Sequence, residues 1–279
     1  MATTERSTQG ANTADSEPGA DRSPSRLALV SVVLRKKLII MVRYPLNTAT
    51  QFLTLSILFA IIFFGGQAVA GPTITDSLAG IIVGMFIWTL AVTAFSSLAW
   101  SVTREAQWGT LERLFMSPNG FGLVMVTKMA VNILLSFFWG FVLLAVMMAL
   151  SGKWLTLDPL TVLPLGLLTL ASVSGIGFLF AGLALLYKRI EKVFQLLQYA
   201  FIALIAAPAG TYPALKLLPL SHGSHLLQRA MEDGVRLWEF APSELGLLVL
   251  TSTVYLFAGY YCLHRAQRRA RRKGLMSQY

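Results

Sequence analysis

The chain contains few charged residues. Only 13% of its 279 residues are Asp, Glu, Lys or Arg, whereas soluble domains carry about 25%. Hydrophobic residues make up 55% of the sequence, and the mean hydropathy is +0.64. This balance excludes an ordinary soluble domain and indicates a protein that lies mainly in lipid.

Residues that usually perform chemistry are also scarce. Cys262 is the only cysteine, which excludes a disulfide within the chain, and we expect it to act as a buried, small apolar residue. The sequence contains no Gly-x-x-x-x-Gly-Lys-Ser/Thr phosphate loop, no His-Glu-x-x-His motif and no Gly-x-Ser-x-Gly elbow. We therefore predict that the chain has no catalytic residue and no metal site, and that it binds no cofactor itself.

Long stretches of the sequence contain no Asp, Glu, Lys or Arg at all. About 20 apolar residues are enough for a helix to cross a bilayer, and the stretches lack the period-two alternation of a membrane barrel. We predict an all-α integral membrane protein with six transmembrane helices, at about 47–64, 78–102, 122–150, 161–187, 193–210 and 245–263. Small residues around Gly175, and the pair Gly80 and Gly84, predict close helix packing.

The net charge of +10 is unevenly placed. With six crossings and the N-terminus inside, the outer segments carry only Lys153, Lys216, Arg229 and Arg236, and the cytoplasmic segments hold most of the Lys and Arg. This bias predicts a multi-pass protein of the plasma membrane with both termini in the cytoplasm. We interpret the basic cytoplasmic tail, 265–279, as an anchor on anionic lipid rather than as a site for nucleic acid.

The N-terminal part divides into two regions. Residues 1–24 are rich in Thr, Ser, Ala and Gly, and we expect a disordered cytoplasmic tail there. From 27 to 44 the apolar residues recur at spacings of three and four, with basic residues on another side. This pattern predicts an amphipathic helix in the membrane interface, ended by Pro45, although an ordinary cytoplasmic extension would also fit. The transmembrane domain would then cover 25–264.

A polar island, 104–118, separates the second and third apolar runs. On a helical wheel Trp108, Leu111, Leu114 and Phe115 share one arc, and Glu105, Gly109, Glu112 and Arg113 gather on the other side. This predicts a short helix that lays one face on a partner or on the bundle. Periodicity alone fits a plain connector equally well. We expect Lys128, just inside the third run, to extend toward the headgroups, with a functional contact as the alternative.

The longest outer segment, 211–243, is too apolar for a free loop. Short helices that dip partly into the bilayer would explain its composition. It also contains His222, His225, Glu232 and Asp233, the polar residues that an integral membrane lipid-modifying enzyme would need near a membrane surface.

The pattern Glu105-x-x-x-Gly109-Thr110-Leu111-Glu112-x-Leu114-x-x-Ser117-Pro118 resembles the cytoplasmic coupling segment of ABC-2 type exporter permeases. The interfacial helix before Pro45, the position of Lys128 and the outer segment resemble the same family. The similarity covers about 27–264 and is greatest to the single-domain permeases of drug, glycolipid and polysaccharide exporters.

The resemblance implies a half-transporter that pairs with a second permease copy and with separate ABC-type ATPase subunits, which bind ATP and Mg. Contact with the ATPase would fall on Glu105, Trp108, Gly109, Thr110, Leu111, Glu112, Leu114 and Phe115, with a second cytoplasmic contact at Lys188, Arg189 and Glu191. Pro213, Pro219 and Arg229 would belong to an external gate. The cargo would be lipophilic or amphipathic and exported. A lipid-modifying enzyme and an assembly scaffold remain the alternatives.

Overall fold

The computed structural model describes residues 26–70, 74–107, 120–187 and 190–272. All regular structure within these ranges is helical. The elements are α1 (Arg26–Arg43), α2 (Pro45–Ala70), α3 (Ile74–Gln107), α5 (Phe121–Ser151), α6 (Pro159–Leu186), α7 (Glu191–Ile205), α8 (Ser221–Glu232) and α9 (Pro242–Arg272), with short 3-10 helices η2 (Pro213–Leu217) and η3 (Leu237–Glu239). The prediction of an all-α protein is confirmed for these residues.

Within the described ranges, five helices are long and apolar enough to cross a membrane. Their spanning parts are Thr48–Gly65, Leu78–Glu105, Phe121–Ser151, Pro159–Leu186 and Pro242–Ala270. The crossing expected at 193–210 corresponds to α7, which has 15 residues. Because a helix rises about 1.5 Å per residue, α7 is roughly 22 Å long and shorter than the ~30 Å hydrocarbon layer. The number of six crossings therefore stays a prediction.

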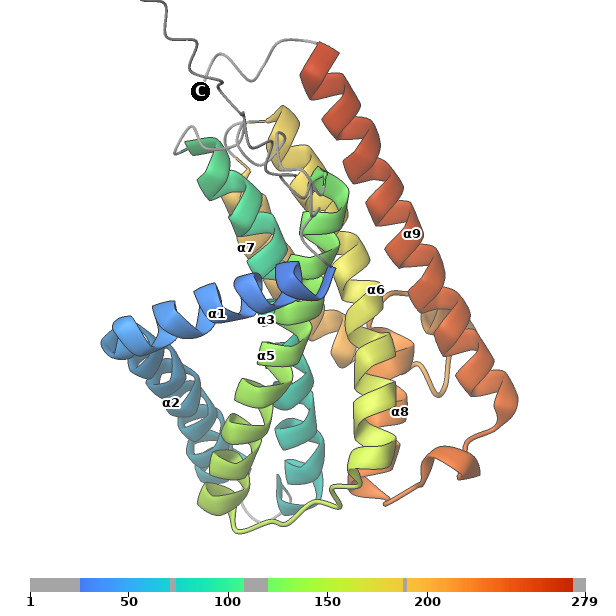
Figure 1. Cartoon of the computed structure of the whole chain (residues 1–279). Helices are drawn as coiled ribbons and strands as arrows, with labels where there is room; N and C mark the ends of the chain where they lie inside the picture. Colours follow the sequence, from blue (N-terminus) through green and yellow to red (C-terminus); the bar gives the residue numbers. More distant parts are fainter. Residues whose placement is uncertain (1–25, 71–73, 108–119, 188–189, 273–279) are drawn as a thin grey trace, which may run out of the picture.

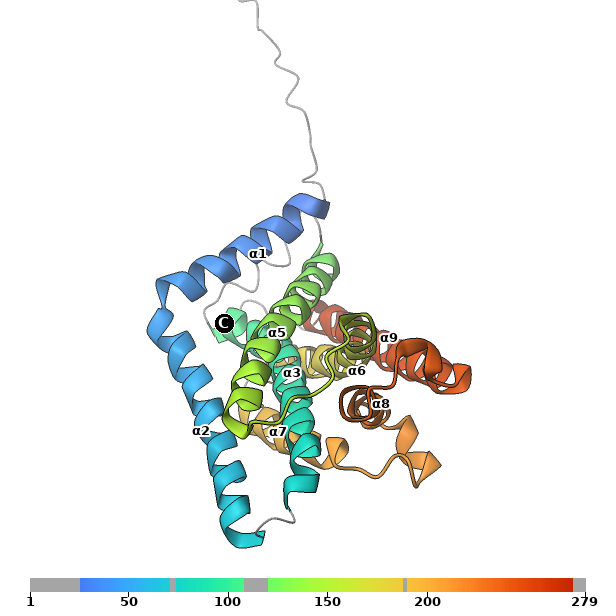
Figure 2. The same cartoon turned by 90° about the horizontal axis from the view of Figure 1, so that it is seen from below.

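The predicted amphipathic helix is present as α1, and it has an unusual direction. It ends at Arg43, and α2 begins at Pro45, where proline is tolerated at the first helical position. α1 runs crosswise to α3, α5 and α6, and together with α2 it forms an L along one side of the bundle (Figures 1 and 2). In a bilayer crossed by the long helices, a helix with this direction lies along the membrane plane.

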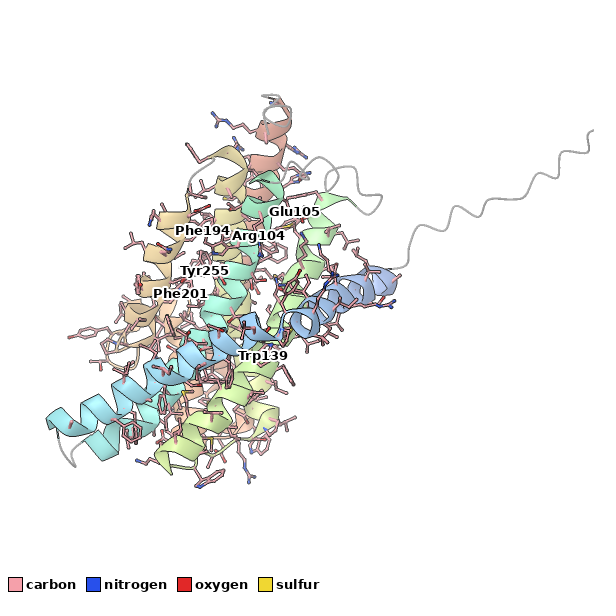
Figure 3. The ribbon with its side chains drawn as sticks, turned by 90° about the vertical axis from the view of Figure 1, so that its left-hand side faces the viewer. Arg104, Glu105, Trp139, Phe194, Phe201 and Tyr255 are labelled. Carbon is pink, nitrogen blue, oxygen red and sulfur yellow. The ribbon has the colours of Figure 1, made fainter. Side chains whose placement is uncertain are left out.

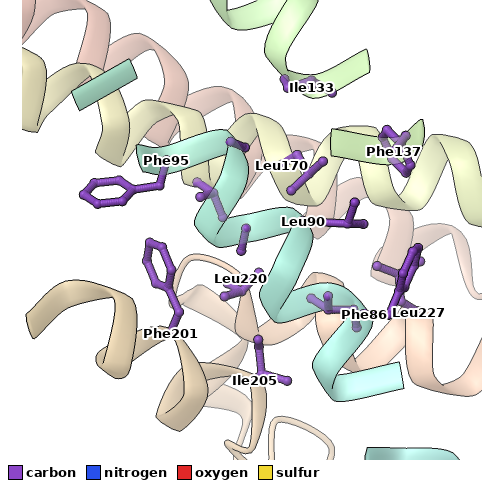
Figure 4. Packing of buried hydrophobic residues seen from close by; sticks show 14 of the residues in the cluster. Phe86, Leu90, Phe95, Ile133, Phe137, Leu170, Phe201, Ile205, Leu220 and Leu227 are labelled. Atoms are coloured by element: carbon purple, nitrogen blue, oxygen red, sulfur yellow. The ribbon is translucent and has the colours of Figure 1, made fainter. Parts of the chain in front are cut away.

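α3 is the centre of the bundle, in contact with α5, α6, α7 and α8. Phe86 and Leu90 are fully buried against neighbouring helices, and Phe95 meets Phe201 of α7 edge to face, with the ring centroids 5.5 Å apart (Figure 4). Such aromatic pairs add about 0.5–1.5 kcal/mol beyond their area burial. The short helix α7 is therefore held by ring packing and by hydrogen bonds to two of its carbonyls, from Trp88 Nε1 to Gln198 at 3.1 Å and from Ser221 Oγ to Leu204 at 2.8 Å.

Glycines bring α6 and α9 into backbone contact. A Cβ atom on Gly175 would overlap the Tyr255 carbonyl, and one on Gly259 would overlap the carbonyl of Gly175. The small-residue prediction for this helix is confirmed. At Gly80 and Gly84 the neighbours are less close, because added Cβ atoms there would lie 3.6 and 3.7 Å from their nearest neighbours, an ordinary contact distance.

α9 continues through residue 272, so residues 265–272 of the predicted basic tail extend the last membrane helix without a break. Cys262 is exposed on this helix, contrary to the expectation that it is buried. Its neighbours Phe257 and Tyr261 are also exposed, as suits a helix face that meets lipid. The predicted tail at 1–24 lies outside the described residues.

We predict that Gly259→Ala destabilises the bundle by about 1–3 kcal/mol, because the new methyl group must push α6 and α9 apart. Gly246→Ala on the same helix is the matched control, since open space surrounds that position. Thermal unfolding of the two variants in mild detergent measures the difference. Equal melting temperatures for both variants would contradict a backbone contact at Gly175.

Candidate functional site

The two ends of the bundle differ in what they carry. At one end α3, α6 and α9 finish and α5 begins, at the top of Figure 1, and we call this the Glu105 end. The opposite end, which we call the α8 end, holds α8 and η3. The described residues form an ion pair at each end, Glu105–Lys128 and Arg229–Glu244.

Glu105 and Lys128 form the ion pair at the Glu105 end. Glu105 lies in the last turns of α3, Lys128 in the second turn of α5, and Nζ lies 3.3 Å from Oε1. Their side chains are 22% and 17% exposed, respectively, so water screens the pair only partly. Figure 3 shows Glu105 beside Arg104 near the end of α3. Lys128 therefore makes a specific contact, in contrast to the expected extension toward headgroups.

The ion pair joins the two helices that flank the polar island. Most of the predicted coupling residues, namely Trp108, Gly109, Thr110, Leu111, Glu112, Leu114 and Phe115, lie outside the described residues, as do Lys188 and Arg189. Glu191 is placed in the first turn of α7, where a carboxylate suits the helix dipole. The described part of the site is thus Glu105 with its partner on α5.

We predict that Glu105→Gln lowers the stability of the bundle by about 1–3 kcal/mol, because it leaves the partly buried Lys128 without its carboxylate. The exchanged double variant, Glu105→Lys with Lys128→Glu, restores most of this loss if the pair itself matters. Thermal unfolding of the single and double variants gives the coupling energy. A double variant no more stable than the singles would contradict the pairing.

A cavity of about 380 Å³ lies between α1, α2, α3 and α5. Lys37 of α1 and Arg104 of α3 line it, and Lys37 Nζ donates to Ser97 Oγ at 3.5 Å. Burial lowers the pKa of Lys37 from its usual range, and the nearby charges of Arg104, Lys128 and Lys36 lower it further. The other walls of the cavity are largely apolar and aromatic, and include Phe52 and Trp139. No sequence signal predicts this cavity, since four separate helices supply its walls.

At the α8 end, Glu244 joins α8 to α9. Arg229 Nη1 donates to both carboxylate oxygens of Glu244, at 3.1 and 3.2 Å, and its guanidinium lies 5.1 Å from the ring centre of Phe240. His222 Nε2 lies 2.9 Å from the carbonyl oxygen of Glu244, and since a carbonyl only accepts, the imidazole donates this bond. α8 is therefore fastened along its length to the start of α9.

The three predicted gate residues lie in the segment from η2 to η3, residues 213–239, which we call the cap. Pro213 begins η2. Pro219 is buried and comes immediately before Leu220, whose backbone has the left-handed φ of +73°. A bulky residue keeps such a φ only where its surroundings enforce it. The expected short helices in the outer segment are confirmed, and they pack together, with Arg229, Ser221 and His222 among the residues that make polar contacts.

The polar residues considered for an enzyme do not gather at one point. His222 is the second residue of α8 and Glu232 is its last, roughly 15 Å apart along the axis at 1.5 Å per residue. Burial, followed by the charge of Arg229, lowers the pKa of His225, whereas burial and then Asp233 raise the pKa of Glu232. Among the described residues, no three His, Cys, Asp or Glu side chains converge to hold a metal ion.

We predict that Arg229→Gln loosens α8, because it removes a bidentate ion pair and a ring contact together. Hydrogen–deuterium exchange in 221–232 should become roughly tenfold faster. Arg236→Gln is the matched control, since Arg236 lies in the same segment but its guanidinium stacks over Trp238 instead. Equal exchange in both variants would show that Glu244 does not hold α8.

Comparisons of the chain with protein-family profiles, with curated proteins and with solved structures found no match.

Proposed function

We propose that the chain is the membrane-spanning permease subunit of an ATP-driven exporter of the ABC-2 type. The observation that carries the proposal is the Glu105–Lys128 ion pair. Glu105 is the first residue of the ABC-2-like pattern, and its partner lies on the helix that follows the pattern. A partner that pulls on the intervening segment would therefore move α3 and α5 together.

Movement of α3 would reach most of the molecule, because α3 contacts α5, α6, α7 and α8. In the proposed mechanism a separate ATPase binds ATP and Mg and docks on 105–117. Its closure would shift α3 and α5 relative to the cap at the α8 end, and the cap would act as the external gate. An apolar pathway through charge-free spans suits a lipophilic or amphipathic cargo. Export is favoured by the family resemblance.

The distribution of charge supports a cytoplasmic Glu105 end. Lys36, Lys37, Arg104, Lys128 and several arginines of α9 lie toward this end, whereas the opposite end has Lys153, Lys216, Arg229 and Arg236. Cytoplasmic segments carry the excess of Lys and Arg in membrane proteins. Both termini would then be cytoplasmic in a plasma membrane. α2 and α9 keep most of their apolar surface exposed, which leaves room for lipid or for a second permease copy.

We predict that Glu112→Arg reduces recovery of a soluble P-loop ATPase with the tagged chain by roughly tenfold, because it reverses a charge on the proposed contact surface. The chain is purified from native membranes in mild detergent, and its partners are identified by mass spectrometry. Glu239→Arg, an equal charge reversal on η3 at the α8 end, is the control and should leave recovery unchanged.

Two results of this experiment would contradict the prediction for Glu112, and each would have a different meaning. An ATPase recovered equally with Glu112→Arg would place docking elsewhere on the chain. Self-association without any ATPase would contradict the permease proposal and would favour the integral membrane lipid-modifying enzyme.

A further inference from the structure

The cavity between α1, α2, α3 and α5 extends along α3 from Thr89 to Arg104. Fifteen residues of helix correspond to roughly 22 Å. Half of a bilayer, including its headgroup region, has about the same thickness. The cavity is thus as long as one lipid leaflet is deep, and its ~380 Å³ lies in the range of about 300–1,000 Å³ for small-molecule sites.

One end of the cavity is cationic. Arg104 lines the end itself, and Lys37 lines the cavity about midway along α3, where its Nζ donates to Ser97 Oγ at 3.5 Å. Within the described residues neither side chain forms an ion pair with a carboxylate. The pKa of Lys37 is lowered by burial and by neighbouring cations, so an anion beside it would relieve an unfavourable charge arrangement. This end therefore favours a phosphate or carboxylate group.

A buried amide marks the same level. Asn132 of α5 lines the cavity with only 5% of its surface exposed. A carboxamide both donates and accepts hydrogen bonds. An occupant with polar atoms at this depth can therefore hydrogen-bond with Asn132.

The deeper part of the cavity does not require a polar occupant. Thr89 and Thr93 donate to carbonyls of their own helix, at 2.8 and 2.7 Å, so their hydroxyl groups need no other partner. Phe52, Leu55 and Trp139 complete the walls. An apolar chain is the occupant that such a surface favours.

We propose that this cavity binds an amphiphile, with its anionic headgroup at Lys37, Arg104 and Asn132 and its apolar tail between α2 and α5. The occupant has either of two sources, an anionic phospholipid of the surrounding leaflet or a diffusible single-chain amphiphile. The proposal does not depend on the permease function, since it concerns a cavity within one chain.

Trp100 and Trp139 line the cavity, so their fluorescence reports its occupancy. The chain is reconstituted in phosphatidylcholine vesicles with increasing fractions of brominated phosphatidylglycerol or brominated phosphatidylcholine, because bromine quenches nearby tryptophans. In parallel, dibromostearate and its uncharged methyl ester are added to vesicles without brominated lipid. In each pair, the anionic probe should bind at least about fivefold more tightly than the probe without net charge, as one lysine near an anionic group contributes about 1 kcal/mol.

Three variants and a control define the site. Lys37→Gln should abolish the anionic preference, Asn132→Leu should weaken it at least about twofold, and the paired Trp100→Phe and Trp139→Phe changes should remove the saturable quenching. Lys36→Gln is the matched control, because Lys36 is exposed next to Lys37 and does not line the cavity. Size-exclusion profiles identify any variant that fails to fold, and Asn132→Leu then tests the site without a change of charge.

The results separate the two sources and the failure of the proposal. A preference for phosphatidylglycerol supports a leaflet lipid, and a preference shown only by dibromostearate supports a diffusible amphiphile. Equal quenching by charged and uncharged probes would overturn the proposal. So would an anionic preference that survives both Lys37→Gln and Asn132→Leu, since it would then arise from the general surface charge.

Discussion

The length of α3 is the constraint on which the rest of the structure depends. A helix of 34 residues is roughly 50 Å long, and the hydrocarbon layer is only ~30 Å thick. About 20 residues separate Leu78 from Ser97, where Lys37 of the crosswise helix α1 makes its contact. If α1 lies at the interface, the remaining turns of α3 extend into the aqueous side. Glu105 and Lys128 can therefore form their ion pair without either group entering hydrocarbon.

Polar contacts fasten the ends of the bundle, and packing holds its middle. Glu105–Lys128 joins α3 to α5 at one end, and Arg229–Glu244 joins α8 to α9 at the other. Between them lie the aromatic contacts of α3 with α7 and the glycine contact of α6 with α9. α1 and α2, by contrast, expose much of their apolar surface. The proposed amphiphile site lies where these less buried helices meet the packed bundle, so its occupant would complete that boundary.

The sequence predicted which segments are helical better than where the helices end. Five of the six predicted crossings coincide with helices long and apolar enough to span a membrane among the described residues. Two of these helices continue further than predicted, α3 past Val102 to Gln107 and α9 past Leu263 to Arg272, because a charged side chain ends burial in lipid without ending a helix. The opposite error occurred at α7, which ends at Ile205 although apolar residues continue. Gly175 was found because small residues cluster around it, whereas Gly80 and Gly84 matched a pattern without a close neighbour. The Glu105–Lys128 distance and the cavity could not be predicted, since both depend on how separate helices meet. The roles of Glu112 and the other coupling residues outside the described ranges stay predictions.

The most direct test of this account is the position of the two bundle ends across a membrane. In a Cys262→Ser background, Arg104→Cys, Leu90→Cys and Glu239→Cys are each reacted with a membrane-impermeant maleimide in sealed vesicles of known orientation. We expect the cysteine at 104 to react only from the cytoplasmic side, the one at 239 only from the opposite side, and the one at 90 from neither. Reaction of the cysteines at 104 and 239 from the same side would contradict the account.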